Sequence, residues 1–107
     1  MSIAQGDIDR AVELFSGLGE ITTRKMMGGL CLYHEGTIFA IVHSDGGIYL
    51  KGQGPMQDRL EEMGCTRWSY TRDTGKTTYM PYWTLPDDAQ DDPDRAAELA
   101  REALQHL

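Results

Sequence analysis

The sequence predicts an α+β fold, in which an antiparallel sheet packs against helices from both ends of the chain. The length of 107 residues fits one domain with a sizeable core. Two β-prone segments joined by Glu35-Gly36 predict a hairpin in the first half of the chain. Apolar residues follow helical spacing near both termini and once in between. We therefore expect a single domain over residues 1–107, with two layers, a sheet of about five strands and the order α-β(3)-α-β(2)-α.

The first helix is predicted to begin at Asp7, because a carboxylate is well suited to cap a helix N-terminus. Gly17 and Gly19 are expected to end it. Residues 21–27 then predict a strand, with β-branched residues at its start. The apolar residues of the helix are Ile8, Ala11, Val12, Phe15 and Leu18.

Gly28-Gly29 interrupts the first strand. Two glycines within a strand usually mark a bulge, a bend or a place where another backbone comes close. Free amides at such a pair can also bind an anion, but no helix start follows this one.

The run Ile38–Val42 is the most apolar part of the chain, and we place it at the centre of the sheet. A strand that is apolar at every position is covered on both faces or lies in mid-sheet. If helices cover one face only, the other face predicts a homodimer or a partner contact, unless loops and the connector over residues 82–91 cover it. The residues expected to be buried are Ile38, Ala40 and Val42, with Phe39 or Ile41 at least largely so.

The middle of the chain predicts a further turn, a second helix and a second hairpin. Ser44–Gly47 turns the chain into a strand over Ile48–Lys51, which Gly52 to Pro55 ends. Pro55 suits the first position of a helix that buries Met56, Leu60 and Met63 and stops at Gly64. Residues 67–71 alternate, which places Trp68 and Tyr70 on one face, and a turn at Asp73–Lys76 returns the chain into 77–80. Pro81 closes this last strand.

The last part of the chain predicts an aromatic connector and a closing helix. Successive side chains alternate between faces, so Tyr82 and Trp83 cannot both point inward. We expect one of them in the core and the other at least partly exposed as a candidate partner contact. The alternative is that both rings pack the closing helix against the sheet. That helix starts at Asp92-Pro93, and its buried stripe comprises Ala96, Leu99, Ala100, Ala103, Leu104 and Leu107.

The net charge of −7 is unevenly distributed. Residues 1–20 carry one basic residue against four acidic ones and residues 84–107 carry two against seven, which leaves seven against six in residues 21–83. The middle therefore offers a candidate basic face for nucleic acid. The overall negative field and the lack of a basic recognition helix argue against that use. The residues of this face are Arg24, Lys25, Lys51, Arg67, Arg72 and Lys76.

No combination of residues predicts catalysis, a metal site or a cofactor. If His34 pairs with Thr37, Cys31 lies opposite Ala40 with His34 on the other face, and His43 lies roughly 20 Å from His34 along the ladder. Cys65 has no activating neighbour in sequence. No apolar run reaches the roughly 18 residues of a membrane span, and the start lacks signal-peptide features. We therefore expect no membrane contact. Two cysteines make no disulfide framework, so we expect a reducing environment and a cytoplasmic protein.

Several motifs occur together in a fixed order. The first group is Arg24-Lys25-Met26-Met27-Gly28-Gly29, Leu32-Tyr33, Gly36, Phe39-Ala40 and Tyr49-Leu50-Lys51. The second group is Met80-Pro81-Tyr82-Trp83-Thr84-Leu85-Pro86 and Asp92-Pro93. Together they span about Ile8 to Leu104, and they resemble the N-terminal domain of TfoX/Sxy proteins.

The resemblance implies a two-layer α+β fold similar to secretion-chaperone-like domains. Well-known members of the family regulate bacterial natural competence by helping the cyclic-AMP receptor protein at particular promoters, and they carry a second, C-terminal domain. We expect here a TfoX N-terminal-like domain without that second domain, and a partner in the transcription machinery. The predicted function is a non-enzymatic protein-interaction module linked to transcriptional regulation. Direct nucleic-acid binding and a chaperone-like or small-ligand-binding role are the alternatives.

Overall fold

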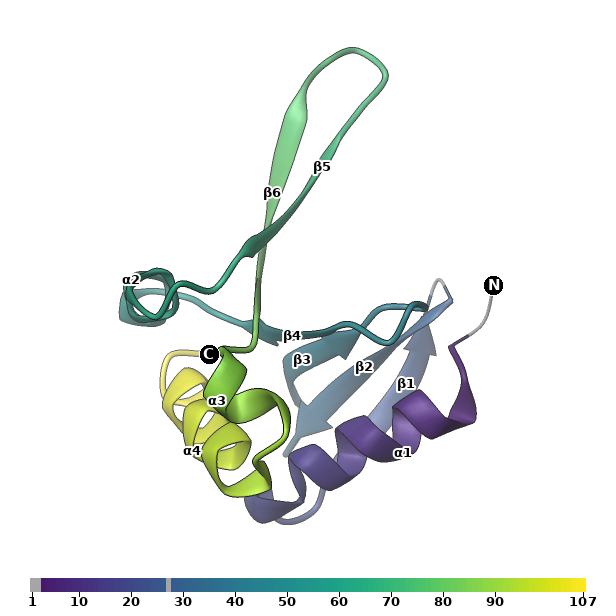
Figure 1. The fold of residues 1–107 in the computed structure, drawn as a ribbon, viewed down its shortest axis with the longest axis vertical. Helices are drawn as coiled ribbons and strands as arrows, with labels where there is room; N and C mark the ends of the chain where they lie inside the picture. Colours follow the sequence, from purple (N-terminus) through teal and green to yellow (C-terminus); the bar gives the residue numbers. More distant parts are fainter. Residues whose placement is uncertain (1–2, 27) are drawn as a thin grey trace.

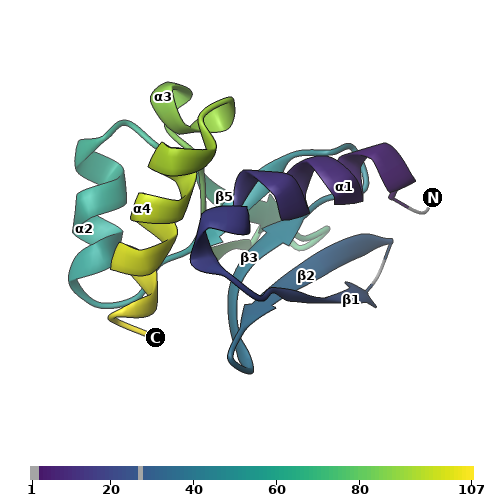
Figure 2. The ribbon, with the colours of Figure 1, turned by 90° about the horizontal axis from the view of Figure 1, so that it is seen from below.

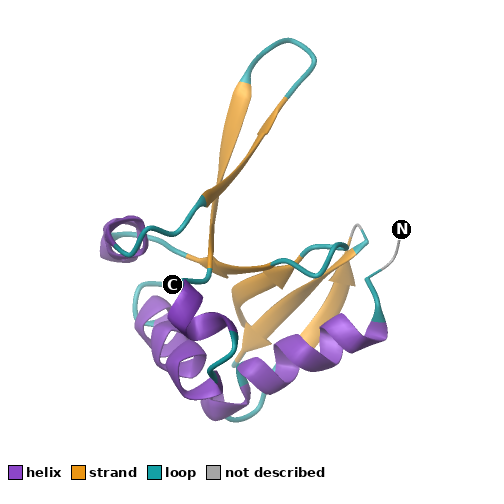
Figure 3. Ribbon diagram, in the orientation of Figure 1, coloured by secondary structure: helices purple, strands orange, loops and turns teal. Residues whose placement is uncertain are grey.

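The computed structural model describes residues 3–26 and 28–107, and it has two layers, a six-stranded antiparallel sheet and helices packed on one of its faces (Figure 1, Figure 3). The strand order is β1-β2-β3-β4-β6-β5. The strands are β1 (Thr22–Met26), β2 (Gly29–His34), β3 (Thr37–Val42), β4 (Ile48–Lys51), β5 (Arg67–Thr71) and β6 (Thr77–Thr84). The helices are α1 (Gln5–Leu14), the 3-10 turn η1 (Ser16–Leu18), α2 (Pro55–Glu62), α3 (Asp87–Gln90) and α4 (Pro93–Leu104).

The predicted α+β class and antiparallel sheet are confirmed, with one strand more than the five expected. The count differs at Gly28-Gly29, where we expected one interrupted strand, whereas β1 and β2 are separate strands that pair antiparallel with each other. The strand predicted over Ile48–Lys51 is β4, which pairs with β3 on one side and β6 on the other. The short helix α3 forms where we expected a connector, and it buries Ala89 against the core. The side chain of Gln90 fixes it by donating to the carbonyl of Leu85 at 3.2 Å.

The starts of two helices show where the capping rules held and where they did not. α1 begins at Gln5, so Asp7 lies within its first turn and the predicted cap there is wrong. Asp92 caps α4 as predicted, since its side chain accepts hydrogen bonds from the amides of Asp94 and Arg95. Pro93 occupies the first turn, where its missing amide hydrogen costs nothing.

The central hairpin contains a β-bulge that changes which side chains are buried. His34 pairs with Thr37 as predicted, but Cys31 pairs with Ile41 instead of Ala40, because the register shifts between Leu32 and Tyr33. The extra residue is Phe39, which joins the core face with no exposed surface. The predicted burial of Ala40 and Val42 is confirmed, whereas Ile38 is only half-buried on the other face.

Gly29 lies where two backbones approach closely, which is one of the possibilities that the glycine pair indicated. A Cβ atom at this position would stand 2.5 Å from the carbonyl oxygen of Val42, so no larger residue fits without moving the strand. Gly28 has a φ of +84°, which other residues rarely adopt. Met27, which belongs to the same motif, lies outside the described residues.

The core lies between the sheet and the helices. Phe15 from α1's C-terminal end meets Phe39 edge to face, with ring centroids 5.2 Å apart. Three alanines of α4 with no exposed surface, Ala96, Ala100 and Ala103, let this helix approach the sheet closely. The largest fully buried side chains are Trp83, Phe15, Phe39, Leu32, Leu50, Met56, Leu60, Leu99 and Val42.

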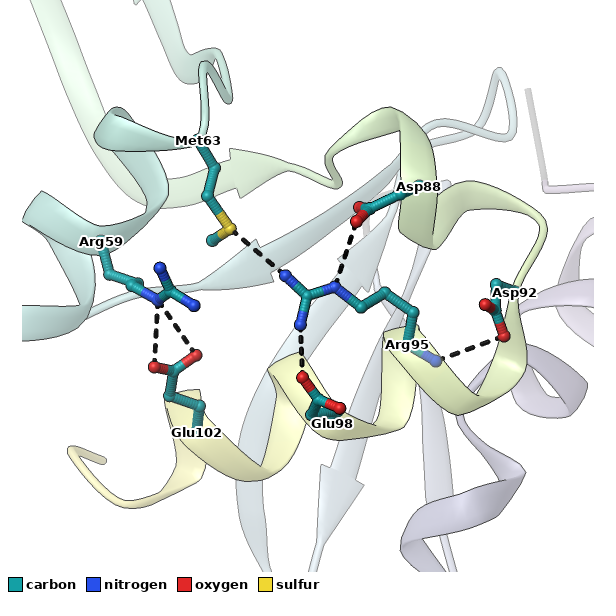
Figure 4. A network of polar contacts seen from close by, with 7 residues as sticks. All are labelled: Arg59, Met63, Asp88, Asp92, Arg95, Glu98 and Glu102. Atoms are coloured by element: carbon teal, nitrogen blue, oxygen red, sulfur yellow. Dashed lines mark hydrogen bonds and ion pairs between the residues drawn. The ribbon is translucent and has the colours of Figure 1, made fainter.

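The helices form a continuous layer in which α4 lies between α1 and α2 (Figure 2). Ion pairs join the exposed sides of these helices (Figure 4). Arg59 of α2 donates to Glu102 of α4 at 3.1 Å, and Arg95 of α4 contacts Asp88 of α3 at 3.3 Å and Glu98 within its own helix. Arg101 donates to the carbonyl of Gly17, which ties α4 to η1. The arginines of this layer are thus engaged within the layer.

The hairpin of β5 and β6 extends well beyond the rest of the molecule (Figure 1). Within β6, only Tyr82–Thr84 pair with β4, so the part of β6 before Tyr82 has β5 as its one described strand partner. We call residues 69–79 the arm. It is almost entirely exposed, and Thr78 is the one residue in it that is half-buried.

Candidate interaction surface

The two faces of the sheet differ in what covers them. One row of side chains runs across the strands into the core, and the next row points to the opposite face because successive residues alternate. None of the described helices covers that opposite face, which we call the open face (Figure 1, Figure 3). The core row is Leu32, Ala40, Leu50 and Trp83, and the open-face row is Cys31, Ile41, Tyr49 and Thr84.

An aromatic cluster lies where the arm meets the sheet. The imidazole of His43 stacks on the Tyr49 ring with centroids 4.4 Å apart, and the indole of Trp68 meets it edge on at 4.5 Å. Trp68 also lies 6.3 Å from the ring of Tyr82 and 6.5 Å from that of Tyr70. Side chains from β4, β5, β6 and the β3–β4 loop therefore meet at this point. We define the aromatic cluster as these five residues.

Burial in the aromatic cluster shifts the pKa of two of its members. Burial lowers the pKa of His43, and the nearby Asp45 carboxylate partly offsets this effect. The Nε2 atom of His43 is buried and has no hydrogen-bond partner among the described residues, so the neutral ring is favoured. Burial raises the pKa of the Tyr82 phenol, with smaller contributions from Cys31 and Tyr33. Both shifts favour the uncharged forms of these two side chains.

Tyr82 and Trp83 point to opposite faces of β6, as alternation requires, but the roles we assigned them need correcting. Trp83 has no exposed surface and lies beside Leu60 and Gly52, so a partner cannot touch it in this fold. Its indole is covered by the guanidinium of Arg67, 4.7 Å from the ring centroid. Tyr82 is on the open face and is 9% exposed, because Trp68 covers part of it.

The six predicted basic residues do not form a single face. Arg24 and Lys25 lie on β1, at one edge of the sheet, whereas Arg67, Arg72 and Lys76 belong to the β5–β6 hairpin at the other edge. Lys51 lies between them on β4, opposite Tyr82. No carboxylate of residues 3–26 or 28–107 lies within ion-pair distance of any of the six.

Charge separates the two layers more sharply than the sequence indicated. Residues 1–20, 53–65 and 85–107, which contain all the helices, carry four basic and 14 acidic residues. Residues 21–52 and 66–84, which contain all the strands, carry six basic and three acidic residues. The net charge is therefore −10 on the helical segments and +3 on the strand segments. The sequence-based division missed this because it counted the acidic helix α2 with the strands.

The arm combines cations with exposed aromatic rings. Tyr79 is 61% exposed and Tyr70 is 40% exposed. The guanidinium of Arg67 lies 5.8 Å from the Tyr79 ring centroid, and that of Arg72 lies 6.0 Å from the Tyr70 ring centroid. Hydrogen bonds from Arg72 and from Thr78 lower the pKa of the Tyr70 phenol. The alternation of residues 67–71 predicted that Trp68 and Tyr70 share a face. Nothing in the sequence indicated that Tyr79 is exposed on the arm, or that His43 and Tyr49 pack against Trp68.

Two surface hollows offer little to a ligand. The larger, about 390 Å³, lies between the β2–β3 turn and the end of α4, but Arg101 in its wall already donates to Gly17. The smaller, about 150 Å³, lies between α1, β4 and Gln90. Neither contains a charged side chain that is itself buried.

The described residues also give no support to metal or thiol chemistry. Among residues 3–26 and 28–107, no three histidine, cysteine or acidic side chains lie close enough together to hold a metal ion. Burial and then Asp88 raise the pKa of the Cys65 thiol, which disfavours the reactive thiolate. Over the same residues, no helix has the length and apolar character needed to cross a bilayer.

Comparison with known proteins points to one family. The model of the TfoX N-terminal domain matches residues 13–107. The chain is also similar to the DNA transformation protein TfoX1 of Aliivibrio fischeri, with 29% identity over 98 residues. That alignment covers 92% of this chain and 46% of the relative, so the chain spans less than half of the relative's length. The matched region includes every strand, the arm and the aromatic cluster, and the chain belongs to the TfoX N-terminal domain family.

Proposed function

We propose that this domain is a non-enzymatic protein-interaction module of a cytoplasmic transcription regulator, and that it contacts its partner through the aromatic cluster and the arm. The observation that carries the proposal is the arm itself. It extends away from the core (Figure 1), exposes two tyrosines, and carries cations with no ion-pair partner in the described part of the molecule. An isolated two-stranded ribbon is marginally stable in water, so a partner that packs against it supplies contacts it lacks.

The composition of this region supports a protein partner. Tyrosine, tryptophan and arginine are the residues that contribute most to binding energy at protein interfaces. The arm and the aromatic cluster contain Tyr70, Tyr79, Trp68 and Arg72, which all lie within residues 68–79 of the β5–β6 hairpin. Their aromatic rings are held by neighbours before binding, which lowers the entropy that binding must overcome.

The link to transcription rests on the family. The relative TfoX1 is a DNA transformation protein, which supports a role in the control of competence or of a related response. The acidic helical segments favour a regulator that binds other proteins over one that binds DNA through its helices.

Site-specific photo-crosslinking tests this function. A photoreactive phenylalanine analogue replaces Tyr79 in the arm or, as a control, the exposed Glu13 of α1, and the protein is crosslinked in its native cell. We expect a transcription factor or an RNA polymerase subunit to be crosslinked from position 79 and not from position 13. Recovery of a metabolic enzyme or a secretion substrate from position 79, or equal crosslinking from both positions, would overturn the proposal.

The cations of the arm favour duplex nucleic acid as a second candidate. A two-stranded ribbon fits the major groove. The β5–β6 hairpin carries three basic residues, Arg67, Arg72 and Lys76, and one acidic residue, Asp73. Such binding weakens steeply with salt, because it releases counterions. A gel shift that is strong at 50 mM salt, lost at 200 mM and abolished by R72Q/K76Q would favour this candidate.

A further inference from the structure

β5 is an edge strand with a free hydrogen-bonding side. It comes last in the strand order, and its only described strand partner is β6. The amide of Arg72 donates to the carbonyl of Lys76 at 2.8 Å, so the main-chain groups of Arg72 point toward β6. Main-chain groups alternate in direction along an antiparallel pair, so those of Tyr70 face β6 and those of Ser69 and Thr71 face outward.

The two edges of the sheet differ in their protection. β1 carries the consecutive cations Arg24 and Lys25 in the middle of its five residues, a common device against further strand pairing. β5 carries no cation at its exposed positions 69–71, and two of the three residues there, Tyr70 and Thr71, favour a strand. No described element covers its outer side, because the arm extends away from every helix (Figure 1).

The charge around this free edge selects the kind of strand that can pair with it. Arg72 and Lys76 flank the turn next to β5, with Asp73 as the one acidic side chain of the arm. Both cations lack an ion-pair partner among the described residues. The exposed rings of Tyr70 and Tyr79 offer apolar contact on the flat sides of the ribbon.

We propose that β5 receives an extended acidic segment of a partner protein as an additional strand of the sheet. The added strand would hydrogen-bond to Ser69 and Thr71, and its carboxylates would pair with Arg72 and Lys76. The inference rests on the proposed function, and it specifies how the partner is held. A second copy of the arm fits less well because it would bring like charges together, and nucleic acid has no backbone amides and carbonyls that continue a β-ladder.

The test uses the full chain and a fluorescent nonapeptide of alternating threonine and glutamate, capped at both ends. Binding is measured by fluorescence anisotropy at 0.15 M salt, where distant charges are screened. We expect saturable binding, and slowed hydrogen exchange at the Ser69 and Thr71 amides. The same peptide N-methylated at its five central residues keeps its charge but cannot pair, and we expect it to bind at least tenfold more weakly.

Two variants of the protein separate main-chain pairing from charge. Thr71→Pro removes an outward amide hydrogen without removing a bond to β6, and we expect it to weaken binding about tenfold. R72Q/K76Q should weaken binding by a similar factor, whereas R24Q/K25Q, which removes the same charge from the other edge, should leave binding within twofold. If Thr71→Pro disturbs the arm, the N-methylated peptide still decides the question on the unaltered protein.

Several results would overturn the inference. These are equal binding of the methylated and unmethylated peptides, binding of a 20-base-pair duplex but not of the peptide, and dimerisation through the arm in sedimentation experiments. If position 79 crosslinks to a transcription factor while the peptide fails to bind, strand addition is wrong and the proposed function stands. If the peptide binds β5 but position 79 captures only a metabolic enzyme, the function is wrong and the binding mode stands.

Discussion

The helical layer and the arm show two opposite ways of using charge. The helical segments carry a net charge of −10, yet Arg10, Arg59 and Arg95 lie within ion-pair distance of acids of the same segments. The strand segments carry +3, and their cations have no ion pair among the described residues. Charge satisfied within a layer supports the fold, and charge left unsatisfied on an extended ribbon is available to a partner.

The same contrast applies to aromatic residues. Phe15 and Phe39 fill the core with no exposed surface, whereas Tyr70 and Tyr79 of the arm are exposed, Tyr79 for more than half of its surface. Trp83 and Trp68 show the contrast within one hairpin, since Trp83 is buried under α2 and Trp68 lies on the open face. Substitutions of the buried aromatic residues should therefore lower stability, whereas substitutions in the arm should reduce partner binding and leave stability nearly unchanged.

The largest expected effect is on the core side. Phe39→Ala should lower the free energy of unfolding by about 3–5 kcal/mol, because it removes a fully buried ring and leaves a cavity against Phe15. Tyr79→Ala, on the arm, should change it by less than about 0.5 kcal/mol. Urea unfolding followed by circular dichroism measures both. Similar losses for the two variants would show that the arm is part of the core.

A smaller effect is expected at the start of α4. Asp92→Ala should cost about 1 kcal/mol, because the amides of Asp94 and Arg95 lose the carboxylate that accepts their hydrogen bonds. Asp91→Ala is the matched control, since Asp91 is almost fully exposed and forms only a long contact to Arg10. If both substitutions cost the same in thermal unfolding, the cap is not what stabilises this helix.

The aromatic cluster predicts a pH dependence of stability. The folded-state pKa of His43 is lowered by burial, so as pH falls below about 6.5 the unfolded chain binds a proton that the folded chain does not. Stability from this residue is therefore complete above that pH and declines toward lower pH. His43→Phe keeps the stacking and removes the titration, so the drop in Tm between pH 7.5 and pH 5.5 should be smaller than in the unaltered protein. An equal drop in both proteins would contradict this assignment.

The smallest effect concerns the ion pairs of the helical layer. Arg59→Gln should cost less than about 1 kcal/mol, because both partners of the Arg59–Glu102 pair are about 40% exposed and well screened (Figure 4). Adding 0.5 M salt should remove most of the difference between the variant and the unaltered protein. A loss that persists at high salt would mean that Arg59 acts through packing rather than charge.

The sequence predicted the elements that depend on local chemistry. Asp92-Pro93 and Pro55 mark helix starts, and Glu35-Gly36 forms a tight turn in which both residues have a positive φ. Such signals act over a few residues and are visible in the chain itself. The family resemblance likewise rests on these motifs and is confirmed by the match over residues 13–107.

Features that depend on distant contacts were harder to predict. The bulge at Phe39 exchanges the burial of Ile38 and Phe39, and no turn residue marks it. The aromatic cluster joins His43 to Trp68 across 25 positions of sequence through the order β4-β6-β5, which strand signals alone do not reveal. The candidate surface was therefore only partly predictable, since its residues are brought together by topology.

Shortening the arm tests the division between the two regions most directly. Replacing residues 71–77 by Asn-Gly joins Tyr70 to Thr78 through a two-residue turn and leaves the aromatic cluster intact. We predict that Tm falls by less than about 4 °C, equivalent to under about 1 kcal/mol, while binding of the acidic peptide weakens at least tenfold. A fall in Tm of more than about 8 °C, or unchanged peptide binding, would contradict the account.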